Sequence, residues 1–190
     1  MTVVELSAQA REPISEMVAR RLARDAERAS KGDPTELILA LDESVRARYG
    51  DFEAFPLSIV RGQDMLVTVT APYMAYRRSL VDLLRTRRPI ADARWLAAVL
   101  VVVEPMRLDA PDIDDVTVTR NGTAVPNVGN MLKAMTFSNG AGEQRAVHAG
   151  SVAFPVAAFE PGADVTLRLS GRAMEAITHS FSDTELATLR

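Results

Sequence analysis

Cysteine is absent from the 190 residues of this chain. Its absence excludes disulfide bonds, thiolate nucleophiles, cysteine-ligated zinc and iron–sulfur clusters. Lysine is nearly absent too, since all but Lys31 and Lys133 of the 22 basic residues are arginine. We interpret this skew, together with the many Ala, Val and Asp residues, as the composition of a GC-rich bacterial genome. Selection of arginine for bidentate contacts with phosphate or carboxylate is the alternative.

Sequence motifs that bind nucleotides or build hydrolase sites are missing as well. The chain has no Gly-x-Gly-x-x-Gly or P-loop sequence and no Gly-x-Ser-x-Gly elbow. Its one glycine-rich stretch, Asn139-Gly140-Ala141-Gly142, follows a predicted strand without leading into a helix, so we expect a turn there. The sequence therefore predicts no cofactor.

Long hydrophobic runs are lacking too. The longest dense run, Trp95–Val103, has nine residues, far fewer than the roughly 20 that cross a bilayer as a helix. Because this run is short, β-branched and stopped by Glu104-Pro105, it predicts a central strand buried on both faces. The N-terminus resembles no signal peptide. We therefore expect a cytoplasmic protein (periplasmic if a leader was removed) without a membrane span; peripheral membrane association stays open.

The first half of the chain is predicted to be mainly helical. Pro13 fits the first turn of a helix that would end near Ser30. Asp33-Pro34-Thr35-Glu36 has Asp at the cap and Pro at the first helical position, and Gly50 is the expected end of that second helix. Two such helices joined by a tight turn predict an antiparallel helical hairpin.

A β-hairpin and a third helix complete this first half. Phe55–Arg61 and Asp64–Thr70 alternate around Gly62-Gln63, as the strands of a hairpin do. Pro72 fits the first turn of the third helix, which would end at Arg87-Arg88-Pro89.

The second half alternates in strand fashion and predicts seven or eight short strands. Asn121-Gly122 is the strongest hairpin signal. Val152–Phe154 stops at Pro155, which predicts an edge strand. The expected fold is α+β, with the helical hairpin, third helix and β-hairpin packed on an antiparallel β-sandwich. The seam at Pro89–Ala93 predicts a helical region, residues 1–93, and a sandwich domain, residues 94–190, unless the two form one compact unit.

The two histidines are the only catalytic candidates. His148 and His179 could each act as a general base with a neighbouring serine, Ser151 or Ser180, as nucleophile. However, adjacent residues on a strand point to opposite faces. We therefore interpret both as ordinary surface or loop histidines.

An acidic loop lies between two predicted strands. Its four carboxylates are Asp109, Asp112, Asp114 and Asp115. Ca²⁺ accepts oxygen ligands from such loops, but the spacing is not that of an EF-hand and the closing glutamate is missing. A solvated turn is the simpler interpretation, and a metal site is the weaker one.

A basic segment precedes the central strand. The five arginines expected to bind a partner are Arg77, Arg78, Arg85, Arg87 and Arg88. The acidic loop follows the same strand, so the two stretches face either one another or a charged partner. Because the net charge is −3, we expect the partner to be a protein rather than a nucleic acid.

We therefore expect a non-catalytic interaction or assembly protein, such as an accessory or scaffolding subunit of a larger bacterial complex. A small hydrolase that uses His148 or His179 is the alternative, and a ligand- or Ca²⁺-binding β-sandwich module is the third candidate. The sequence leaves the partner's identity and the oligomeric state open.

Overall fold

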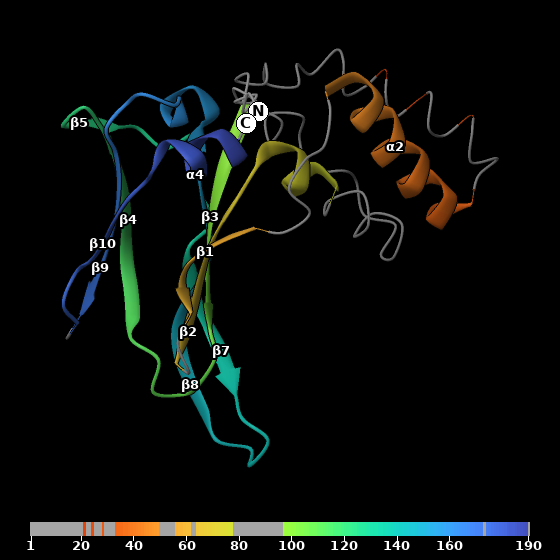
Figure 1. Ribbon diagram of the computed structural model, residues 1–190. Helices are drawn as coiled ribbons and strands as arrows, with labels where there is room; N and C mark the ends of the chain where they lie inside the picture. The colour runs from red at the N-terminus through yellow and green to blue at the C-terminus, as the bar shows by residue number, and fades with distance from the viewer. Residues whose placement is uncertain are drawn as a thin grey trace, which may run out of the picture.

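The computed structural model describes residues 33–49, 56–61, 64–77, 97–172 and 174–189, together with Arg21, Arg24 and Arg28. Within these residues the fold is broadly α+β, with two antiparallel sheets (Figure 1). The larger sheet contains β1 (Leu57–Arg61), β2 (Met65–Thr70), β3 (Ala98–Pro105), β6 (Gly129–Asn130), β7 (Lys133–Ser138) and β8 (Gln144–Pro155). The smaller sheet contains β4 (Asp112–Arg120), β5 (Thr123–Val125), β9 (Val165–Arg172) and β10 (Ile177–Ser180).

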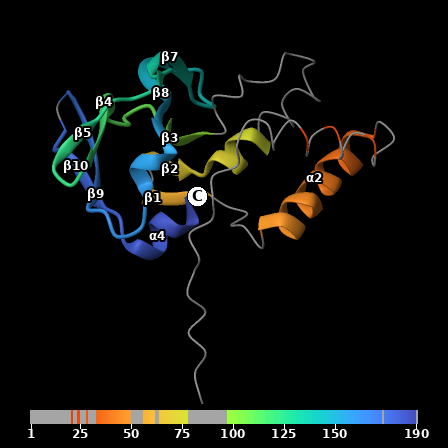
Figure 2. The same ribbon diagram turned by 90° about the horizontal axis from the view of Figure 1, so that it is seen from above.

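Helices accompany the sheets. They are α2 (Pro34–Tyr49), the 3-10 helix η2 (Val156–Phe159), α4 (Asp183–Thr188) and the helical residues 72–77. Seen from above, α2 stands apart from the sheets, and the helical residues 72–77 lie between α2 and the sheets (Figure 2). No helix among the described residues is long and apolar enough to span a membrane.

Both sheets contribute to one hydrophobic core. β2, β3 and β8 supply alternate valines and Phe154 from the larger sheet, while β4 and β9 supply residues such as Ile113 and Leu167 from the smaller one. Phe159 of η2 packs edge-on against Phe181, with ring centroids 5.6 Å apart, and Leu186 of α4 joins them. Burial of this apolar surface is the main favourable term in folding, so this shared core holds the two sheets together.

The hydrophobic run forms a central strand, as predicted from residue 98 onward. β3 lies between β2 and β8 and pairs antiparallel with both. The expectation of burial on both faces holds only in part, because Val99, Val101 and Val103 are buried whereas Leu100 and Val102 are half-buried. One face of β3 therefore meets the core, and the other is partly open. Trp95 and Leu96 lie outside the described residues.

Several predicted starts and turns are confirmed. Helix α2 begins at Pro34, and the Asp33 carboxylate accepts hydrogen bonds from the backbone N–H groups of Thr35 and Glu36 at 2.7 and 3.1 Å. β1 and β2 form the expected hairpin and join the larger sheet through β3. The described part of the predicted first helix, 13–30, consists of Arg21, Arg24 and Arg28, which are helical. The predicted seam, 89–93, lies outside the described residues.

The prediction of an edge strand at Val152–Phe154 is wrong. These residues belong to β8, which runs unbroken from Gln144 to Pro155 and pairs with β3 on one side and β6 on the other. Pro155 ends the strand, where a missing N–H disturbs the pairing least. Proline therefore marked the end of a central strand here.

The first part of β8 leaves the body of the larger sheet. Pairing with β3 stops at Val103 and Gly150, and residues 144–149 pair instead with β7. These two strands form a hairpin, here called the arm (residues 133–149), which extends beyond the rest of the sheet (Figure 1).

Candidate functional site

The acidic residues of the β3–β4 connection face basic groups of the chain itself. Asp109 pairs with Arg107, Nε to Oδ1, at 3.1 Å. Asp112 lies 3.3 Å from Arg145 of the arm, and its other oxygen accepts a hydrogen bond from the backbone N–H of His148, also at 3.3 Å. This N–H belongs to the part of β8 that β3 no longer reaches. Asp112 thus covers an open stretch of strand edge.

The start of β4 departs from the predicted turn. Strand β4 already begins at Asp112, because Ile113 points into the core and is fully buried. Arg145 adds a second link between arm and loop by donating to the carbonyl oxygens of Leu108 and Ala110 at 2.8 and 3.4 Å. Within the described residues, no three His, Asp or Glu side chains gather as metal ligands do.

His148 lies on the arm beside Asp114. Its Nδ1 is 3.3 Å from Asp114 Oδ1, and both side chains are about one-third exposed. Arg172 Nε lies 3.7 Å from the other Asp114 oxygen. The imidazole nitrogen is buried but is not aligned for a hydrogen bond to the carboxylate. Such a pair can orient an imidazole, and an imidazole can move a proton near neutral pH.

His179 on β10 lies beside Glu185 of α4. Its Nε2 is 3.2 Å from Glu185 Oε1, and its ring packs edge-on against Phe181. Ser182 forms a capping box with Glu185 and donates both its backbone N–H and its hydroxyl to Oε2, at 2.8 and 2.9 Å. Burial opposes ionisation of Glu185, but the bonds from Ser182 and the nearby His179 hold its pKa below the usual value. The carboxylate is thus held in place as a helix cap.

Neither histidine reaches a nucleophile among the described residues. Ser182 bonds to the carboxylate rather than to His179, and Ser180 faces Thr166 at 3.4 Å. A hydrolytic site needs a hydroxyl within hydrogen-bond reach of the base. Within the described residues, a carboxylate lies beside each imidazole, but no hydroxyl lies within hydrogen-bond reach of either ring.

One of the predicted partner-binding arginines lies in an internal cluster. Arg77 Nε lies 3.0 and 3.1 Å from the two oxygens of Asp42, whose side chain is buried in α2. The Tyr73 hydroxyl donates to Asp42 at 2.5 Å. Burial and this bond raise the pKa of the Tyr73 phenol, and the bond to Asp42 raises the pKa of Arg77. Arg78, Arg85, Arg87 and Arg88 lie outside the described residues.

We expect Asp42→Asn to lower the free energy of unfolding by about 1–2 kcal/mol. Asparagine keeps an acceptor for Tyr73 but removes the charge that offsets the half-buried Arg77. Urea unfolding followed by circular dichroism measures the change. Glu43→Gln, on the exposed side of the same helix, is the matched control and should stay within about 0.5 kcal/mol of the parent. Equal effects of the two substitutions would contradict the role of the cluster.

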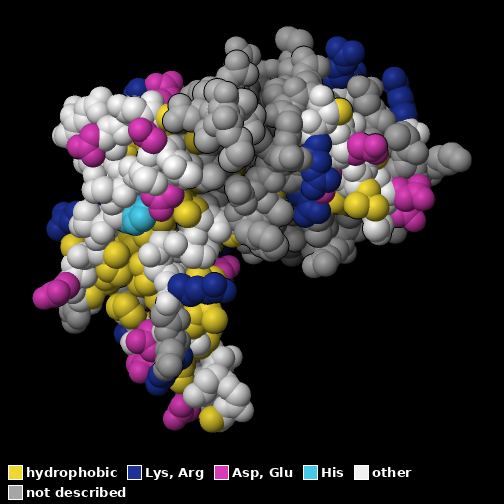
Figure 3. Space-filling model, in the orientation of Figure 1, with side chains coloured by type: hydrophobic (Ala, Val, Ile, Leu, Met, Phe, Trp, Pro, Cys, Tyr) yellow, Lys and Arg dark blue, Asp and Glu magenta, His cyan; other side chains and the backbone are white. Residues whose placement is uncertain are grey.

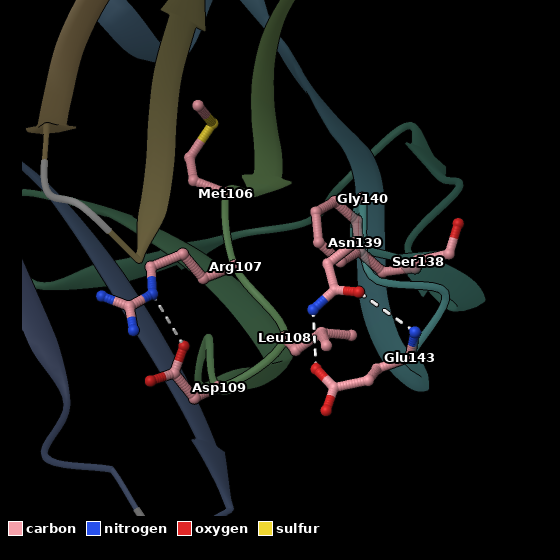
Figure 4. A pocket seen from close by; sticks show the side chains of 9 residues that line it. Met106, Arg107, Leu108, Asp109, Ser138, Asn139, Gly140 and Glu143 are labelled. Carbon is pink, nitrogen blue, oxygen red and sulfur yellow. Dashed lines mark hydrogen bonds and ion pairs between the residues drawn. The ribbon is translucent and has the colours of Figure 1, made fainter.

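A pocket of about 630 Å³ lies between the β3–β4 connection and the tip of the arm (Figure 4). Met106, Leu108 and Phe137 supply its apolar surface. Arg107 and Asp109 pair on one side, and on the other Asn139 donates to Glu143 at 2.7 Å. The lining of the pocket is therefore a mixture of apolar and polar or charged side chains, and neither histidine belongs to it. Sequence reasoning missed it because its walls come from two separate turns.

Comparison with known proteins does not assign the chain to a family. No family model matches the chain, and no curated protein matches it. Among solved structures, a protein of unknown function from Burkholderia pseudomallei is similar, with 10% identity over 92% of this chain and 93% of that one and a TM-score of 0.41. A DUF4426 family protein from Pseudomonas aeruginosa is 17% identical over 66% of this chain and 90% of that one, with a TM-score of 0.28.

Proposed function

We propose that this protein is a non-catalytic interaction or assembly protein, such as an accessory subunit of a larger bacterial complex, and that the arm makes the contact. The observation that carries the proposal is the exposure of the arm. Five of the six residues of β7 are exposed, as are the first three of β8. A two-stranded hairpin alone is at best marginally stable in water, so a partner that covers the arm would stabilise it.

Exposed apolar side chains near the arm support this proposal. Met135 on β7 is 46% exposed, and Met131 and Val128 just before it are 47% and 56% exposed. Methionine adapts its shape to different surfaces and is common at protein contacts. Hydrophobic side chains are also visible over the lower part of the face seen in Figure 3, which is consistent with a contact at this end.

We also propose two finer features of the fold. The two sheets form a β-sandwich, which is supported by the single buried cluster to which both contribute. Residues 13–30 pair with α2 as a helical hairpin, which is supported by the helical Arg21, Arg24 and Arg28. In this arrangement the sandwich is a rigid base from which the arm extends.

The hydrolase alternative draws on the two imidazole–carboxylate pairs. It would further require a nucleophile beside His148 or His179, and no described hydroxyl bonds to either ring. The Ca²⁺-binding alternative draws on Asp109, Asp112, Asp114 and Asp115, of which three lie against arginine or histidine. The contact function needs no such additional group, and we prefer it for that reason.

A photo-crosslinking residue tests the proposed function. We expect a photo-crosslinker at Met135 to capture a discrete protein in cells of the native host, whereas one at Ala124, exposed on the short edge strand β5, captures none. Ala124 is the matched control because it too lies on the edge of a sheet. Equal labelling at both positions, or none at Met135, would remove the arm as the contact surface.

A further inference from the structure

We propose that the pocket between the β3–β4 connection and the tip of the arm binds an organic cation, that is, an ammonium or guanidinium group joined to an apolar body (Figure 4). The proposal goes beyond the contact function and does not rest on it. It follows from three features of the pocket: walls that are held in place, apolar side chains that are open to solvent, and an excess of negative charge.

The two walls of the pocket are held in place and are tied to each other. In one wall, the backbone N–H of Met106 donates to the carbonyl oxygen of Asp64 at 2.8 Å. In the other, Oδ1 of Asn139 accepts two backbone N–H groups of its own turn, both at 3.0 Å. Arg145 of the arm reaches the first wall and donates to the carbonyl oxygen of Leu108 at 2.8 Å. The pocket therefore exists before a ligand arrives, and binding does not have to order its walls.

Apolar side chains in the lining are open to solvent. Met106 is 52% exposed, and Leu108 and Phe137 are half-buried. An apolar ligand that covers these side chains removes their surface and its own from water, which is the general source of affinity for such ligands. A pocket of about 630 Å³ has room for an aromatic ring or a branched alkyl group.

The charged side chains of the lining favour a cation. They are one arginine and two carboxylates, Arg107, Asp109 and Glu143. Arg107 is already engaged, because its Nε lies 3.1 Å from Asp109 and its Nη1 lies 3.6 Å from Asp64. Glu143 accepts from Asn139 through Oε2 at 2.7 Å, so its Oε1 has no hydrogen bond within the described residues. The unbalanced charge is therefore negative, and Glu143 offers an acceptor to an ammonium or guanidinium group.

Free amines and the basic side chains of proteins share this chemistry. Phenethylamine represents the first source, and the capped dipeptide acetyl-phenylalanyl-lysine amide represents the second. Phenethyl alcohol and phenylacetate have nearly the same apolar body as phenethylamine but are neutral and anionic. Comparison of these probes therefore isolates the effect of charge on binding.

Titration of the full-length, isotope-labelled chain, followed by NMR, tests the proposal. We expect the amide shifts of residues 106–109 and 137–143 to saturate with phenethylamine at a Kd of about 1–10 mM, the range for so small a ligand. The Kd of phenethyl alcohol should be about two- to fivefold higher, because an exposed ion pair contributes a difference of this size. Phenylacetate should bind more weakly still, since it meets two carboxylates and an arginine that is already paired.

Three variants separate the charge from the apolar contact. Glu143→Gln keeps the size of the side chain and should make the amine and the alcohol bind equally. Glu43→Gln, on the exposed side of α2, is the matched control and should leave the preference for the amine unchanged. Met106→Ala, at an exposed position, should weaken the binding of amine and alcohol by the same factor.

Three results would overturn the proposal: an amine that binds no more tightly than the alcohol, a preference that persists in Glu143→Gln, or no saturation below about 50 mM. Binding of the dipeptide alone would assign the site to a basic side chain of a protein, and binding of the free amine alone would assign it to a small amine. Binding of both would show that the shared cation is the group recognised. None of these results depends on capture of a protein by the arm, so failure here leaves the contact function standing.

Discussion

Replacing Gly171 by alanine is expected to lower the free energy of unfolding by more than about 3 kcal/mol. Gly171 on β9 pairs with Ile113 on β4, where the register shifts between Ile113 and Asp115. A Cβ atom at this position would lie 1.6 Å from the carbonyl oxygen of Asp112 and 2.7 Å from its carbon. Both contacts are with backbone, so no side-chain rotation can relieve them. The two strands must separate, which exposes Ile113 and disturbs the core.

Thermal unfolding measures this effect. For a chain of this size a loss of 3 kcal/mol corresponds to a fall of about 6–12 °C in Tm. Gly140→Ala is the matched control, because a Cβ there meets nothing within 4 Å, and its Tm should stay within about 1–2 °C of the parent. A Gly171→Ala variant as stable as this control would show that β4 and β9 are not so closely paired.

Local signals predicted those parts of the fold that depend on a few neighbouring residues. Asp33-Pro34 begins a helix because the aspartate accepts two N–H bonds within its own turn. Asn121-Gly122 forms the β4–β5 turn, where both residues have positive φ angles of 51° and 74°. The structure shows the same kind of local cap at α4, where Ser182 and Glu185 form a capping box. Each of these caps and turns forms within four consecutive residues, so it can be predicted from the local sequence alone.

The parts that were predicted wrongly depend on partners far away in the chain. Pro155 suggested an edge strand, but β3 and β6 lie on either side of β8. Asp112 suggested a turn, but Gly171, 59 residues later, lets β4 begin there by allowing close approach of the backbones. The spacing of residues in the sequence does not indicate which two strands approach each other this closely. A strand's place within its sheet therefore had to come from the structure.

The candidate site divides in the same way. The sequence identified both histidines, but their carboxylate partners lie at very different distances along the chain. Glu185 lies six residues from His179 and belongs to a recognisable cap, whereas Asp114 lies 34 residues from His148. The cluster of Asp42, Tyr73 and Arg77 also joins distant residues, and the sequence analysis did not single out Asp42, which follows the buried Leu41 in α2. Arg77 was therefore predicted as a surface residue.

Replacing Gly150 by alanine is expected to cost about 2–4 kcal/mol and to disturb the arm more than the body. Gly150 is the first residue of β8, in chain order, that pairs with β3, so it lies at the root of the arm. Its φ angle is +135°, which L residues rarely adopt, and a Cβ would lie 2.3 Å from the carbonyl oxygen of Met131. Alanine must therefore push residues 131–132 away from β8, and these residues lead directly into β7.

Hydrogen exchange locates the disturbance. We expect faster exchange of amides in residues 133–149 than in the parent, with smaller changes in β4 and β9. Gly142→Ala at the arm tip is the matched control, since it has φ +83° but open space around a Cβ, and should cost only the backbone strain of about 1–2 kcal/mol. If Gly150→Ala leaves the arm protected but Met135 contacts are lost, the direction of the arm matters for binding. Uniform exchange changes across both sheets would instead show that Gly150 supports the whole core.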